Sequence, residues 1–202
     1  SLAVVSVIPT DHSTFGCSSC HIFHNSQGVA LNNVAGNANL CMTCHVTGGI
    51  AGGKPFNNAM KAIPGTGGTS HNWNTPAINA QRETVTPANS QMLARLATGQ
   101  IVCSTCHDQH NPNTFGSYLR ATNIGDALCK DCHSPRNVGR YTDNTLLNKG
   151  SHPVGVIFNS SDPGLLSAPI SPYNYPGNKV ECSSCHQSHY STSADGNLLK
   201  SL

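Results

Sequence analysis

The sequence predicts a chain that is mostly coil, with short helices and few short strands. Two observations predict this fold class. Glycine occurs 19 times and proline 12 times among 202 residues, so long regular elements would be interrupted often. Only 37 % of the residues are hydrophobic and 5 % are aromatic, too few to fill a conventional interior. We therefore expect the core to be built largely from something other than the chain's own side chains.

Three elements are expected outside the cysteine motifs. Residues 2–8 are rich in valine and predict a short strand, which would pair within its own domain or be added to a neighbour. The glycine-rich stretch 48–68 is typical of a linker. A helix is predicted over residues 89–99, with Met92 as a packing residue. Further short helices are expected at the cysteines.

All ten cysteines fall into five copies of Cys-x-x-Cys-His, which we number motifs 1 to 5 in chain order. Residues i, i+3 and i+4 share one face of a helical turn, so two sulfurs and one imidazole converge in each copy. This spacing is the attachment pattern of c-type haem, with two thioethers and a proximal histidine ligand to the iron. The copies are Cys17-Cys20-His21, Cys41-Cys44-His45, Cys103-Cys106-His107, Cys129-Cys132-His133 and Cys182-Cys185-His186. The sequence thus predicts five covalently bound haem c groups.

Zinc and disulfides are the alternative uses of such cysteines. Motifs 1 and 2, like motifs 3 and 4, have roughly the separation of a zinc ribbon. Zinc would leave two cysteines over and gives no reason for a histidine after every pair. Disulfides across two-residue gaps would constrain almost nothing. Haem attachment uses every residue of the repeated pattern.

Six of the eleven histidines lie outside the motifs, enough to give every iron a second axial ligand with one to spare. Three of them follow a motif histidine by three residues, and the other three precede motifs 1, 3 and 5. With only three methionines in the chain, we expect low-spin haems with two histidine ligands and rather negative potentials. The candidate distal ligands are His24, His110 and His189 in the first group and His12, His71 and His152 in the second.

The motifs form a repeat, which divides one pentahaem domain over residues 1–202 into three units. Units one and two, residues 1–70 and 71–150, carry two motifs each, and residues 151–202 form a half unit with motif 5. This arrangement resembles the doubled Cys-x-x-Cys-His family of multihaem cytochromes. More narrowly, such small, loop-rich chains resemble the subunits of extracellular cytochrome filaments made by metal-respiring microbes.

The narrower resemblance implies stacked haems that form the core, and copies of the chain that join head to tail. It also implies that a histidine ligates a haem of the next subunit. We expect His12 or His189, near the two ends of the chain, to take that part. Redox donor and acceptor proteins or extracellular acceptors would complete the path.

Electron transfer is favoured over catalysis. A multihaem reductase needs an iron with an open coordination position, whereas candidate ligands outnumber irons here, and no hydrolytic constellation is present. A soluble periplasmic electron carrier is the alternative that uses the same haems, in brief encounters with its partners.

The net charge of +2 excludes a strongly basic chain, and we expect no nucleic-acid partner. No apolar run is long enough to span a bilayer, and residues 1–9 lack an initiator Met and a basic leader, as in an exported, processed chain. We expect an extracellular or cell-surface location, or alternatively the periplasm. The scattered basic residues fit haem propionates better than a nucleic-acid surface, although each of them alone is expected to be solvated: Lys54, Lys61, Arg82, Arg95, Arg120 and Arg136.

Overall fold

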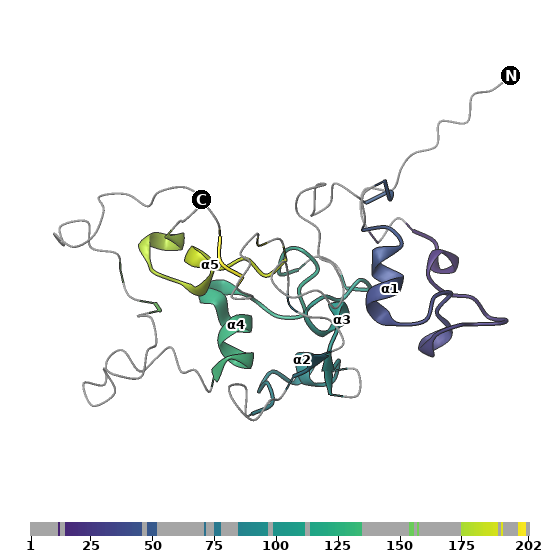
Figure 1. The fold of residues 1–202 in the computed structure, drawn as a ribbon, viewed down its shortest axis with the longest axis horizontal. Helices are drawn as coiled ribbons and strands as arrows, with labels where there is room; N and C mark the ends of the chain where they lie inside the picture. The colour runs from purple at the N-terminus through teal and green to yellow at the C-terminus, as the bar shows by residue number, and fades with distance from the viewer. Residues whose placement is uncertain are drawn as a thin grey trace, which may run out of the picture.

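Coil dominates the part of the chain that the computed structural model describes (Figure 1). Described are residues 12, 15–45, 48–51, 71, 75–77, 85–96, 99–111, 114–134, 154–155, 157, 175–189, 191 and 198–200. The strand expected over residues 2–8 and most of the expected linker lie outside them. In the described residues the predicted fold class, mostly coil with short helices and few short strands, is confirmed.

The regular elements are short. The α-helices are α1 (Asn37–Met42), α2 (Ser90–Leu93), α3 (Cys103–Cys106), α4 (Ala127–Cys132) and α5 (Cys182–Cys185). The 3-10 helices are η2 (Cys17–Ser19), η3 (Val29–Leu31), η4 (Ile124–Asp126) and η8 (Pro176–Asn178). Strand β1 (Thr75–Pro76) pairs antiparallel with β2 (Gln100–Ile101).

Every motif lies on or beside a helical turn, as its spacing predicts. In all five, the backbone N–H of the motif histidine donates to the carbonyl of the first cysteine, at 2.9–3.1 Å. In α3 and α5 a hydroxyl inside the motif closes the start of the turn: Thr105 accepts from the N–H of Val102 at 3.0 Å, and Ser184 accepts from Glu181 at 2.9 Å. Both hydroxyl residues are buried. The polar spacer residues therefore stabilise the turn that brings the ligands together.

Helix α2 begins where the sequence predicts but is shorter. The side chain of Asn89 caps it, accepting from the N–H groups of Gln91 and Met92 at 3.0 and 3.2 Å. Beyond Leu93, the N–H of Ala94 still donates to the carbonyl of Ser90, four residues back, but those of Arg95 and Leu96 donate only three residues back. Thr105 Oγ1 donates to the Arg95 carbonyl at 3.1 Å. The prediction of a helix to residue 99 was therefore wrong at residues 94–96 and 99, which lie outside α2.

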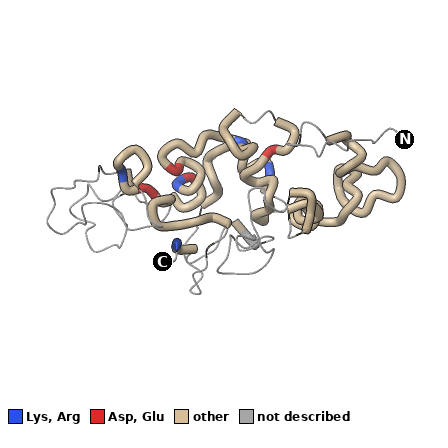
Figure 2. Tube along the Cα trace, turned by 90° about the horizontal axis from the view of Figure 1, so that it is seen from above, with Lys and Arg blue, Asp and Glu red and all other residues tan. Residues whose placement is uncertain are grey.

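In the described part of the chain, the core made by side chains is small. Its buried hydrophobic residues are Ala38, Met92, Val102 and Leu128, where α1 and α2 pack against α3 and where α4 begins. Met92 is 1 % exposed, which confirms its predicted packing role. More large hydrophobic residues are exposed than buried in the described part. Among its helices none is long and apolar enough to cross a membrane, and its charged residues are few and scattered (Figure 2).

Candidate haem-binding sites

The same closed loop follows motifs 1, 3 and 5. In each, the residue after the motif histidine donates its N–H to a carbonyl of the returning chain, and the returning chain donates an N–H to the carbonyl of the motif's second cysteine. We call residues 20–33, 106–120 and 185–200 clamp loops 1, 2 and 3. The bonds are Ile22 to Leu31 and Asn33 to Cys20, Asp108 to Tyr118 and Arg120 to Cys106, and Gln187 to Leu198 and Lys200 to Cys185, at 2.7–2.9 Å.

Left-handed backbone in clamp loops 1 and 2 turns a carbonyl onto the motif histidine. Ala30 and Ser117 have φ of 55° and 49°, values that L residues adopt rarely. Their carbonyls lie 2.9 Å from His21 Nδ1 and 2.8 Å from His107 Nδ1. A carbonyl can only accept, so Nδ1 carries the proton and the Nε2 lone pair is left for a metal. Sequence reasoning missed these two contacts, because backbone carbonyls leave no side-chain signal.

Four of the six non-motif histidines lie ring to ring with a motif histidine from a distant part of the chain. Metal–imidazole bonds are about 2.0 Å long and the ring centre lies about 1 Å beyond the nitrogen, so imidazoles on opposite sides of one iron have centroids about 6 Å apart. The observed separations match this value. They are His21–His110 at 6.0 Å, His45–His12 at 5.8 Å, His107–His189 at 5.8 Å and His133–His71 at 6.3 Å.

Burial keeps the best-covered of these pairs neutral. It lowers the pKa of His189 to about 4, with smaller contributions from His107 and His71. Burial also lowers the pKa of His107, against the hydrogen bond to the Ser117 carbonyl, which raises it. Neutral imidazole is the form that binds a metal. The electrostatics of this pair therefore fit axial ligands.

The remaining two candidate ligands are not brought to a motif by the described structure. His24 is exposed in clamp loop 1 and makes no hydrogen bond or ring contact with another described residue. His152 lies outside the described residues. As ligand assignments, all six distal candidates stay predictions.

The ten cysteines are free thiols, as thioether formation requires. The thiols of Cys41 and Cys103 form a hydrogen bond, which lowers the pKa of Cys41 and raises that of Cys103. Cys129 and Cys182 form the same contact, with the pKa of Cys129 raised and that of Cys182 lowered. The attachment points of motifs 2 and 3, and those of motifs 4 and 5, are thus immediate neighbours.

Two further hydrogen bonds join the same neighbouring motifs. At the start of α3, the N–H of Ser104 donates to the Asn37 side chain of α1 at 3.0 Å. At the start of α5, the N–H of Ser183 donates to the side chain of Asp126, the residue just before α4, at 2.7 Å. The second motif of one unit is therefore joined to the first motif of the next in the same way twice.

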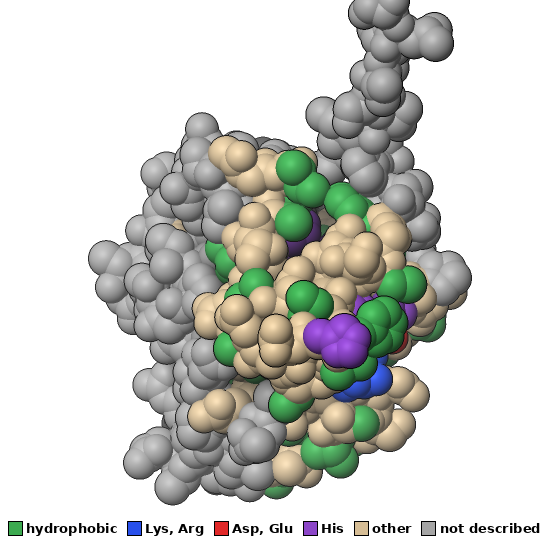
Figure 3. All heavy atoms as spheres, turned by 90° about the vertical axis from the view of Figure 1, so that its right-hand side faces the viewer, with side chains coloured by type: hydrophobic (Ala, Val, Ile, Leu, Met, Phe, Trp, Pro, Cys, Tyr) green, Lys and Arg blue, Asp and Glu red, His purple; other side chains and the backbone are tan. Residues whose placement is uncertain are grey.

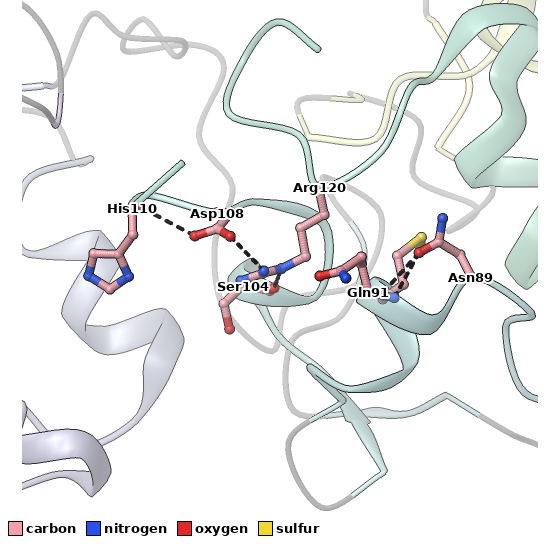
Figure 4. Close-up of polar contacts among 7 residues, drawn as sticks. Asn89, Gln91, Ser104, Asp108, His110 and Arg120 are labelled. Carbon is pink, nitrogen blue, oxygen red and sulfur yellow. Dashed lines mark hydrogen bonds and ion pairs between the residues drawn. The ribbon is translucent and has the colours of Figure 1, made fainter. Parts of the chain in front are cut away.

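Arg120 connects motif 3 to a candidate ligand (Figure 4). Its Nε donates to the Ser104 carbonyl at 2.6 Å and its Nη1 to Asp108 Oδ2 at 2.9 Å. The other oxygen of Asp108 accepts from the N–H of His110 at 3.1 Å. This chain of contacts holds the start of the His110 segment against α3 through the buried guanidinium of Arg120. The pairing of Arg120 with a propionate stays a prediction.

Comparison with known families agrees with the motif analysis. Residues 94–137 match the doubled CXXCH motif family. The match covers motifs 3 and 4, less than half of the chain, and indicates covalently bound haem c. It supports a multihaem c-type cytochrome that takes part in electron transfer. No curated protein and no solved structure matches the chain.

Proposed function

We propose that the chain carries five haem c groups and transfers electrons along them. The observation that carries this proposal is the set of four histidine pairs, each with the separation of two axial ligands and each containing a motif histidine. Bound haem c supplies a one-electron couple of its iron. The motif cysteines would attach the group, and the carbonyls of Ala30 and Ser117 leave Nε2 of His21 and His107 for a metal. The four histidine pairs would supply two ligands each, an arrangement suited to electron transfer rather than to substrate binding.

The attachment points follow the chain order through the molecule. Contacts join Cys41 to Cys103 and Cys129 to Cys182, as described above. Motifs 1 and 2 are also close, since Cys41 and Cys44 raise the pKa of Cys20 after burial, the largest cause. Motifs 3 and 4 are close as well: besides the hydrogen bond to Cys182, the largest cause, the nearby Cys106 also raises the pKa of Cys129. This succession along the long axis favours one continuous path over isolated centres (Figure 1).

Intact mass and carbon monoxide binding test this function. We expect the chain plus five haems, and at least four of the reduced irons should not bind carbon monoxide, because each of the four histidine pairs would supply two ligands to one iron. A chain without covalent haem would overturn the proposal. Carbon monoxide binding at most of the irons would favour a multihaem enzyme instead.

We further propose that copies of the chain join head to tail into an extracellular or cell-surface filament. Clamp loop 1 carries exposed large side chains: Ile22 is 41 % exposed, Phe23 79 %, Val29 87 % and Leu31 44 %. Hydrophobic and histidine side chains gather on this end of the molecule (Figure 3). An apolar patch of this kind marks an interaction surface. The described part of α5 lies toward the other end, so the contact would join unlike surfaces and remain open-ended.

His24 is the residue that we propose to cross this contact. The sequence favoured His12 or His189, but the structure places both beside motif histidines of their own chain. His24 is exposed within the apolar end. There it could ligate a haem of the neighbouring copy, while redox partners or extracellular acceptors take electrons from the polymer.

Negative-stain microscopy of the native protein tests the filament. We expect filaments, and we expect Phe23→Ser to abolish them, whereas Ile124→Ser, at an equally exposed apolar residue outside clamp loop 1, leaves them intact. Uniform single-chain particles in the unaltered protein would favour the soluble periplasmic carrier. His24→Ala should weaken the filaments and leave each chain's haem content unchanged.

A further inference from the structure

We infer that each of the four histidine pairs holds a single haem, which assigns a sixth ligand to four irons. His110 serves the haem of motif 1, His12 that of motif 2, His189 that of motif 3 and His71 that of motif 4. The inference rests on the proposed haem function and deepens it, because neither motif spacing nor a family match says which histidine reaches which iron.

The geometry of the pairs supports the assignment. Three of the four have nearly parallel ring planes, inclined by 18°, 27° and 26° for His21–His110, His107–His189 and His133–His71. The fourth pair is inclined by 57°, at a centroid separation within the same narrow range. In the two pairs that contain His21 and His107, the Nδ1 atom is already bonded to a clamp-loop carbonyl, so only Nε2 is available to an iron.

The assignments follow one register that occurs twice. Clamp loops 2 and 3 are closed by the same two backbone hydrogen bonds, and each carries a histidine three residues after its motif histidine. His110, in clamp loop 2, reaches back to motif 1, and His189, in clamp loop 3, reaches back to motif 3. Each clamp loop thus ligates the haem of the first motif of the preceding unit. Two independent occurrences of the same step favour a repeated structural rule over a chance contact.

The upstream histidines follow a second register. His12 precedes motif 1 and lies beside His45 of motif 2, while His71 precedes motif 3 and lies beside His133 of motif 4. Each therefore serves the second motif of its own unit. Clamp loops help to place both: the N–H of His12 donates to Tyr118 Oη at 3.2 Å, and the N–H of His71 donates to the Ser188 carbonyl at 3.2 Å.

The two registers together connect the units. A clamp loop contributes a ligand to the preceding unit, and it also positions the upstream histidine that pairs with the second motif of that same unit. Applied to clamp loop 1, the first register directs His24 to a haem one unit earlier. In a head-to-tail polymer that haem would belong to the third unit of the neighbouring copy, which agrees with the filament proposal without depending on it.

The test uses the intact five-haem chain and removes one distal ligand at a time. In His110→Ala and His189→Ala, electron paramagnetic resonance of the ferric protein should show the low-spin signal falling by the share of one haem. Gln109→Ala, at the exposed residue next to His110, is the control and should lose none. Intact mass confirms that each variant still carries all its haems.

Methyl NMR then locates the altered iron, because a high-spin ferric centre broadens nearby signals. His110→Ala should broaden Val29 and Leu31 of clamp loop 1, and His189→Ala should broaden Val102 and Leu119 beside motif 3. Broadening at any other motif would overturn the assignment while leaving the electron-transfer function in place. A low-spin signal that survives either substitution unchanged would overturn it as well. Absence of covalent haem in the unaltered chain would instead refute the proposed function.

Discussion

Replacing Arg120 by methionine should weaken the binding of His110, the proposed second ligand of the motif 1 haem, through the intervening Asp108. Arg120→Met keeps an unbranched apolar stem but removes both guanidinium bonds, to Asp108 and to the Ser104 carbonyl. The Arg120 side chain is 4 % exposed, whereas that of Asp108 is 23 % exposed and can regain some hydration. Hydrogen bonds to charged groups contribute roughly 1.5–3 kcal/mol each, so we expect a net loss of about 2–4 kcal/mol in the free energy of unfolding.

The effect on haem ligation follows from the second oxygen of Asp108. That carboxylate also holds the N–H of His110, so a released Asp108 leaves the His110 segment less firmly fixed. We expect one more reduced haem per chain to bind carbon monoxide than in the unaltered protein. Denaturant unfolding should measure the loss in the free energy of unfolding. Arg95→Met is the matched control, since Arg95 is exposed. If Arg120→Met were as stable as Arg95→Met and bound no more carbon monoxide than that control, the proposed path from Arg120 to His110 would be refuted.

Two other substitutions test the protein framework. Met92→Ala should lower the free energy of unfolding by about 2–5 kcal/mol, because a fully buried side chain is removed between α2 and α3; a loss below that of exposed Leu93→Ala in the same denaturant titration would argue against this small core. Ser117→Gly should raise stability by about 0.5–1 kcal/mol, because its φ of 49° suits glycine and its contact to His107 uses only the backbone. A decrease in the unfolding midpoint of Ser117→Gly would show that the hydroxyl matters more than the backbone conformation.

The sequence was most informative where chemistry dictates residue spacing. The motifs predicted helical turns, and the turns are present because an i, i+4 backbone bond closes each one. Composition predicted a thin core, and the start of α2 could be predicted because Asn89 is a strong capping residue. The end of α2 could not be predicted, because it depends on Thr105, a residue ten positions beyond Arg95.

The pairing of histidines was beyond the reach of the sequence for a similar reason. His110 and His189 stand at identical offsets from their motifs, but their partners lie one unit away, and only the closed clamp loops bring them there. At Ala30 and Ser117 the sequence does not indicate a positive φ, since neither residue is glycine or asparagine. Their conformation is imposed by the closure of the loop.

The most direct test of the central claim is electron paramagnetic resonance of the ferric native protein, with spin quantified per chain. We expect at least four low-spin haems with two histidine ligands for every chain, one for each observed pair. Fewer than four, or a high-spin signal that dominates the spectrum, would contradict the account of paired axial histidines along a single electron path.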